Sequence, residues 1–157
     1  MASTYEPIAT TTLGSAAASY TFSSIPSAWT DLVIIVAGTD SALAAIGLQF
    51  NSDTGSNYSR TTLSGDGSAA SSDRQTSLTS SNIGLIGTVQ SNTIFSIMNY
   101  SNSTTYKTTL ARANVSDSLV RAAVGLWRNT AAITSIKLLS NSFQTGTTLT
   151  LYGIAAA

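Results

Sequence analysis

The chain has 157 residues, of which 43% are hydrophobic and only 9% are charged, with seven basic residues balancing seven acidic ones. Its length suits one domain, and its composition excludes disorder, because disorder requires low hydrophobicity and high net charge. The absence of histidine and cysteine removes the usual general base, disulfides and thiolate metal sites, and two lysines are too few for a surface that binds nucleic acid.

The N-terminal residues 1–7 precede the first predicted strand and are expected to form an extended arm. They contain neither the basic region nor the apolar region of a signal peptide. The longest apolar run, residues 32–37, is far shorter than the roughly 18 residues that a membrane helix needs. We therefore expect no membrane partner.

Short runs of β-branched and aromatic residues alternate with Gly, Asn, Asp and Ser clusters, a pattern typical of an all-β sandwich. The predicted strands, in chain order, cover residues 8–13, 19–25, 32–39, 46–51, 58–63, 82–88, 94–100, 106–113, 119–127, 133–139 and 147–154. The chain is therefore predicted to be a single all-β domain spanning residues 1–157.

Residues 32–37 are apolar in both strand phases, and the strand at 119–127 has a second face that could also be covered. Residues 32–37 are predicted to lie centrally in a sheet or under a neighbouring subunit, because both faces must be covered. In the strand at 119–127, the face predicted to point into the core carries Val120, Ala122, Val124 and Leu126. The opposite face holds Arg121 and Trp127 beside small residues, and it is predicted to form either a second buried layer or a subunit contact.

The segments between strands include one long polar stretch and one Asn- and Asp-rich stretch. Residues 64–81 contain little that could be buried, so a long loop is predicted there. Residues 51–57 (NSDTGSN) place oxygen atoms at spacings like those of a calcium loop, but Asp53 is their only charged residue. The prediction for residues 51–57 is therefore a turn.

The sequence contains no catalytic constellation. Without histidine, a serine nucleophile would need Lys107 or Lys137 as its base, and both lysines are predicted to lie on exposed strand faces. A glycosidase could use only Glu6 and six aspartates, most of which fall in predicted turns. We therefore expect a protein that is not an enzyme and that holds no metal or cofactor.

Four residues are predicted to contact other subunits: Tyr5 in the arm, Trp29 before the apolar strand, and Arg121 and Trp127 on the second face of the strand at 119–127. Tryptophan, tyrosine and arginine supply much of the binding energy at protein interfaces. For Trp29 and Trp127 the alternative is burial in the core of this chain, because aromatic side chains dominate core packing.

The beginning, the middle and the end of the sequence resemble one protein family. The matching segments at the beginning are residues 5–13 (YEPIATTTL), 22–26 (FSSIP) and 30–33 (TDLV), and the middle segment is residues 50–59 (FNSDTGSNYS). The segments at the end are residues 125–128 (GLWR), 131–136 (AAITSI) and 151–154 (LYGI). Together these segments resemble small virion structural or tail-fibre proteins of tailed phages, especially phages of cyanobacteria. The family often shows Asn-Gly-Asp where this chain has Asn51-Ser-Asp53, so the turn must form here without that glycine.

This resemblance implies a jelly-roll-like antiparallel β-sandwich with a structural role in a virion. Near-zero net charge favours association, and a surface rich in Ser and Thr suits permanent contacts that salt affects little. The first hypothesis is therefore a decoration or cement protein on a phage capsid, a homotrimer that contacts the major capsid protein. The alternative is a tail-fibre or receptor-binding module that contacts a host surface glycan through the polar segment 64–81.

Overall fold

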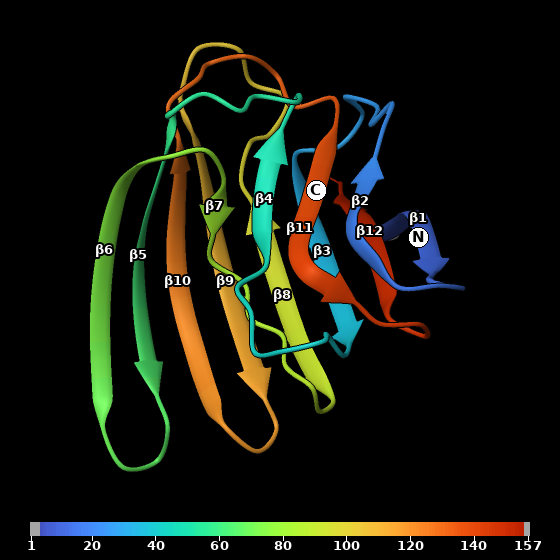
Figure 1. Ribbon diagram of the computed structural model, residues 1–157. Coiled ribbons are helices and arrows are strands. Elements are labelled where there is room, and N and C mark those ends of the chain that lie inside the picture. Colours follow the sequence, from blue (N-terminus) through green and yellow to red (C-terminus); the bar gives the residue numbers. More distant parts are fainter. Residues whose placement is uncertain (1–3, 156–157) are drawn as a thin grey trace.

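The computed structural model describes residues 4–155, which form two antiparallel β-sheets packed face to face (Figure 1). Within these residues the strands are β1 (Tyr5–Thr12), β2 (Ala17–Phe22), β3 (Asp31–Gly38), β4 (Gly47–Phe50), β5 (Tyr58–Gly65), β6 (Ala70–Leu78), β7 (Ser81–Asn82), β8 (Ser91–Ile97), β9 (Lys107–Val115), β10 (Leu119–Trp127), β11 (Ile136–Phe143) and β12 (Thr148–Ile154). The predicted all-β sandwich is confirmed. The described residues include no helix long and apolar enough to cross a membrane.

The order of the strands identifies the topology. The larger sheet has the order β1-β12-β3-β8-β9-β10-β5-β6, and the smaller sheet has the order β2-β11-β4-β7. The antiparallel pairs β1–β12, β2–β11, β3–β8 and β4–β7 fall alternately in the two sheets. Such an arrangement is one long hairpin wound into a sandwich, which is a jelly roll. The jelly-roll-like fold implied by the resemblance is therefore confirmed.

Two inserted hairpins, β5–β6 and β9–β10, extend only the larger sheet. β9 pairs with β8, β10 lies between β9 and β5, and β6 pairs with β5. Figure 1 shows β5 and β6 to one side of β7, the edge strand of the smaller sheet. The smaller sheet therefore covers the larger one over only part of its width.

The core lies between the two sheets and is formed by alternate residues of each strand. Leu32 and Ile34 of β3 and Leu149 and Leu151 of β12 are completely buried on the inner side. The inward phase predicted for β12 is confirmed, because Thr148 and its outward neighbours are more exposed. β3 lies between β12 and β8, which confirms the central position predicted for residues 32–37.

All eleven predicted strands overlap observed ones, but the predicted loop at 64–81 is wrong. Ala70–Leu78 form β6, which pairs along β5 with Arg74 opposite Thr61. β6 is an edge strand whose residues are nearly all exposed, so it lacks the apolar alternation by which strands are predicted. Within the segment predicted at 82–88, regular pairing is limited to the short strand β7 and an isolated bridge at Ile86.

The expected N-terminal arm lies partly on the sheet. Tyr5 and Pro7 belong to β1 and pair with Ile154 and Tyr152 of β12. Residues 1–3 of the expected arm lie outside the described residues. The described part of the arm therefore packs on this chain's own sheet.

Candidate functional site

The outward side of the extended half of the larger sheet is apolar and exposed. Leu63 of β5, Leu110 of β9, and Val120 and Val124 of β10 are 62%, 43%, 60% and 44% exposed. Isolated exposed hydrophobic residues are normal, but a cluster on adjoining strands typically marks an interaction site. We call this side the outer face. It consists of the outward-pointing residues of β8, β9, β10 and β5, including Leu63, Ile94, Leu110, Arg112, Val120, Ala122 and Val124.

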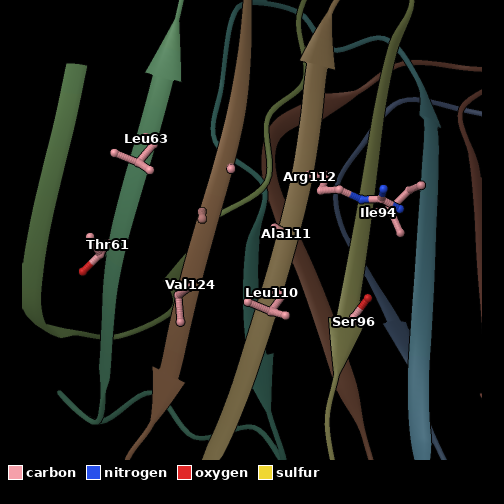
Figure 2. Close-up of a pocket in the computed structure, with 10 residues that line it drawn as sticks. Thr61, Leu63, Ile94, Ser96, Leu110, Ala111, Arg112 and Val124 are labelled. Carbon is pink, nitrogen blue, oxygen red and sulfur yellow. The ribbon is translucent and has the colours of Figure 1, made fainter. Parts of the chain in front are cut away.

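A groove runs across the outer face. Strand register places Ala122 of β10 between Leu63 of β5 and Arg112 of β9. The small alanine leaves space between its larger neighbours, and the groove has a volume of about 380 Å³ (Figure 2). A second hollow of about 410 Å³ shares Ile94, Arg112 and Ala122 with the first. Together these hollows give the outer face a concave, largely apolar surface.

The outer face corrects the predicted orientation of β10. Val120, Ala122 and Val124 point outward, whereas Trp127 and the small residues between point into the core. Gly125 gives the physical reason, because a Cβ atom there would lie 2.0 Å from the Ser81 Oγ atom of β7. The close approach of β7 leaves room only for a small inward residue at this point of β10, so the neighbouring Val124 points outward, whereas Trp127 at the end of the strand packs inward.

Arg112 is the charged residue at the centre of the outer face. Its side chain is exposed, lines both hollows, and makes no hydrogen bond or ion pair with any of the described residues. At the outward positions of β5, β6, β8, β9 and β10 the charged residues are Arg112 and Arg74, and none of these positions is acidic. Asp73 of β6 lies in the opposite strand phase, where it pairs with Arg60, and Asp66 and Asp117 lie in the two hairpin turns. The outer face is therefore apolar with a basic centre.

Trp127, predicted as a possible subunit contact, is instead part of the core and only 1% exposed. Its ring packs against Phe50 and Tyr58 with ring centroids 5.4 and 6.3 Å away. Its indole Nε1 donates a hydrogen bond of 2.7 Å to the Asp53 carboxylate. Trp127 therefore belongs to the core of this chain, which was the alternative prediction, and it is not available for contact with another subunit.

The turn predicted at 51–57 is confirmed, and Asp53 organises it. Burial would raise the pKa of Asp53, but hydrogen bonds from Trp127, Asn57 and Gly55 lower it below its usual value. Ser52, at the position where the phage proteins that the sequence resembles often have glycine, has a φ of 59°. This serine therefore adopts the left-handed conformation that glycine would reach without steric cost.

Arg121 lies on the inward side of β10 and is only partly exposed. Its guanidinium donates hydrogen bonds of 3.3 Å to Ser64 Oγ and to the Gly84 carbonyl. Burial, together with the neighbouring positive charge of Arg60, lowers the pKa of Arg121. Its described hydrogen bonds are therefore internal to this chain, and it lies on the opposite side of the sheet from the outer face.

Trp29 and Tyr5, the two remaining predicted contacts, lie near the β1 edge of the larger sheet. Trp29 is partly buried over Gly153, and its Nε1 donates a hydrogen bond of 3.1 Å to the Glu6 carboxylate. Tyr5 is 58% exposed and packs edge-on against Tyr152. The structure therefore does not bring the four predicted contact residues together at one surface.

Lys107, predicted to be exposed, is 1% exposed and lies on the inward side of β9. Its Nζ donates hydrogen bonds of 2.8 and 3.0 Å to the carbonyls of Thr105 and Thr130, and burial lowers its pKa. Lys137 is partly exposed on the smaller sheet. Among the described residues, no group of three or more His, Cys, Asp or Glu side chains is placed to hold a metal ion.

Sequence reasoning missed the residues of the outer face. The sequence of the strand at 106–113 could have indicated an outward face, because Leu110 and Arg112 share one strand phase and Thr109 and Ala111 share the other. Hydrophobicity alone does not identify the inward phase there, because each phase mixes apolar and polar residues.

No protein-family model and no curated protein matches the chain. Among solved structures, the fold is similar to that of Caenorhabditis elegans galectin LEC-6, with a TM-score of 0.39 and 9% sequence identity. The similarity covers 94% of this chain and 96% of that protein. A likeness this distant does not bear on function.

Proposed function

We propose that this chain is a non-enzymatic structural protein of a bacteriophage particle, most specifically a decoration protein on the capsid surface. Its resemblance to virion proteins of tailed phages supports the proposal. The wound-hairpin topology also supports it, since jelly rolls are common in viral capsid and lectin domains. Because one fold serves many functions, the proposal depends on the surface of the molecule more than on its topology.

The observation that carries the proposal is the exposed outer face. A face that bears Leu63, Leu110, Val120 and Val124 at about half exposure favours permanent contact with another protein. The proposed partner is the major capsid protein, with the chain itself assembled as a homotrimer. A decoration protein would act mechanically, because burial of more than about 1,000 Å² per contact, repeated over a shell, resists internal pressure.

The test is to locate the protein on purified particles and to count its copies by cryo-electron microscopy. We expect hundreds of copies over the head, and particles that lack the protein should lose their DNA at a lower temperature. A few copies at the tail would contradict the decoration role and would support the alternative, a receptor-binding module for a host glycan. Absence from the particle would refute both.

A matched pair of variants connects the function to the outer face. Leu110→Asp changes an exposed leucine of the outer face, whereas Leu43→Asp changes a leucine that is 52% exposed in the loop before β4. We expect Leu110→Asp to prevent rebinding to stripped particles and Leu43→Asp to rebind normally. Equal rebinding by both variants would show that the outer face is not the contact.

A further inference from the structure

We propose that the groove of the outer face binds a short apolar segment of a partner protein, and that a carboxylate of this segment pairs with Arg112. The inference deepens the proposed function, on which it rests for the partner's place in the virion. The chemistry of the groove can be tested without the particle.

The position of Arg112 is the first argument. Its side chain starts on β9 opposite Ile94 of β8 and, as Figure 2 shows, extends toward that residue across the apolar surface. Arg112 lines the same groove as Ile94, Leu110 and Ala122, so its charged group loses water when another surface covers the groove. Covering an unpaired charge is costly, so a partner that binds here must supply an opposite charge or leave the guanidinium in water.

The absence of acidic side chains on the outer face is the second argument. Since Arg112 has no ion-pair partner among the described residues, this chain does not itself neutralise the groove. Two copies that met through their outer faces would bring Arg112 and Arg74 of each copy into one interface without a carboxylate. Charge complementarity therefore favours a different partner, one that presents an acidic side chain. A carboxylate can accept two parallel hydrogen bonds from a guanidinium.

The shape of the groove is the third argument. Ala122 forms a low floor between Leu63 and Arg112, and the neighbouring row on β10 and β9 places Val124 beside Leu110. A volume of about 380 Å³ falls at the lower end of the range of roughly 300–1,000 Å³ for pockets that enclose a ligand. The groove therefore suits a few inserted apolar side chains, with specificity set by the single pair at Arg112.

The experiment titrates the isotope-labelled chain with three synthetic peptides and follows it by nuclear magnetic resonance. Each peptide alternates leucine and threonine and carries Asp, Asn or Lys at its centre. We expect signals of Leu63, Leu110 and Val124 to shift, and the Asp peptide to bind about tenfold more tightly than the Asn peptide. Arg112→Gln should remove this preference, and Arg112→Lys should restore part of it.

The control variant is Lys137→Gln, which makes the same change in net charge on the smaller sheet. It should keep the tenfold preference for Asp. Equal affinity of the chain for the Asp and Asn peptides would overturn the inference, as would a preference that survives Arg112→Gln. No binding of any peptide would also overturn it. So would a dimer of this chain in sedimentation that Leu110→Asp dissociates, because a second copy would then occupy the groove.

These outcomes are separable from those of the proposed function. If the chain covers the phage head and the peptides show no preference, the inference alone fails. If the Asp preference depends on Arg112 and the chain is absent from particles, the virion role fails while the specificity of the groove stands.

Discussion

Individual residues at one end of the core link the turn at 51–57 to the aromatic cluster. The hydroxyl of Tyr58 donates a hydrogen bond of 3.2 Å to the Asp53 carbonyl and accepts one of 2.9 Å from the Phe50 amide. Its ring stacks on Trp127, whose indole also holds Asp53. A buried polar cluster that is fully hydrogen-bonded specifies one arrangement of the core, so each member is costly to remove.

We predict that Tyr58→Phe destabilises the fold by about 1–3 kcal/mol near pH 8, because it leaves the buried Phe50 amide and Asp53 carbonyl without a partner.

Burial raises the pKa of Tyr58 from 10.0 to about 12. The Asp53 charge adds a smaller increase to this pKa, and the hydrogen bond from the Phe50 amide opposes it. The unfolded chain therefore loses this proton first as the pH rises above 10. The stabilisation is complete below pH 10 and is lost toward pH 12, by on the order of 2–3 kcal/mol.

The Tyr58→Phe variant lacks this loss, so the difference in unfolding free energy between wild type and variant should shrink from pH 8 to pH 11. Urea unfolding followed by tryptophan fluorescence measures it. Tyr106→Phe, at a tyrosine that is 54% exposed, is the control and should leave the pH dependence unchanged. A constant difference across this range would refute the assignment.

At the scale of elements, β10 illustrates how a strand with two apolar phases is oriented. Trp127 and Ala123 occupy the inward phase, and Val120 and Val124 remain exposed. Burying both valines instead would bring larger side chains against β7, which leaves no room for a Cβ atom at Gly125. The approach of a neighbouring strand therefore outweighs the hydrophobic gain from the larger residues.

We predict that Gly125→Ala destabilises the fold by about 1–3 kcal/mol, because the new methyl group would overlap Ser81 Oγ and lie 3.2 Å from Ile83 Cδ1. Ala122→Val, on the same strand but on the outer face, should change stability by less than about 0.5 kcal/mol. Denaturant unfolding of both variants measures the contrast. A cost below about 0.5 kcal/mol for Gly125→Ala would mean that β7 moves aside easily.

At the scale of the whole molecule, the two inserted hairpins widen one sheet of a jelly roll and leave the smaller sheet unchanged. The extension creates the outer face, since its strands have outward residues that this chain does not cover. Only Arg112 among the residues around the groove is charged, so most of the proposed contact is apolar. Such a contact differs physically from one made of many surface ion pairs, which salt weakens.

We predict that raising sodium chloride from 0.1 to 0.5 M weakens rebinding of the chain to stripped phage particles by less than about threefold. Quantitative sedimentation of particles with bound protein measures this. The Arg112→Gln variant should show a still smaller dependence on salt, because its single charge pair is gone. A loss of about a hundredfold would show instead that charged contacts dominate and that the outer face is not the main contact.

Local sequence determined most of the strands, their order in the chain and several of their faces. On β12, Leu149 and Leu151 alternate with threonines, so only one phase can supply the core, and its orientation follows from sequence. The turn around Asp53 also follows from its own residues, because Asn, Asp and Gly satisfy the backbone of a turn locally.

Tertiary structure decided the features that depend on segments distant in the chain. β6 exists because β5 offers it a pairing edge, and its exposed polar residues carry no signal of that pairing. Lys107 is buried because carbonyls of two loops accept its hydrogen bonds. The outward phase of β10 depends on how closely β7 approaches Gly125. The candidate docking site was therefore beyond sequence reasoning, because its residues become a surface only when β5, β8, β9 and β10 lie side by side.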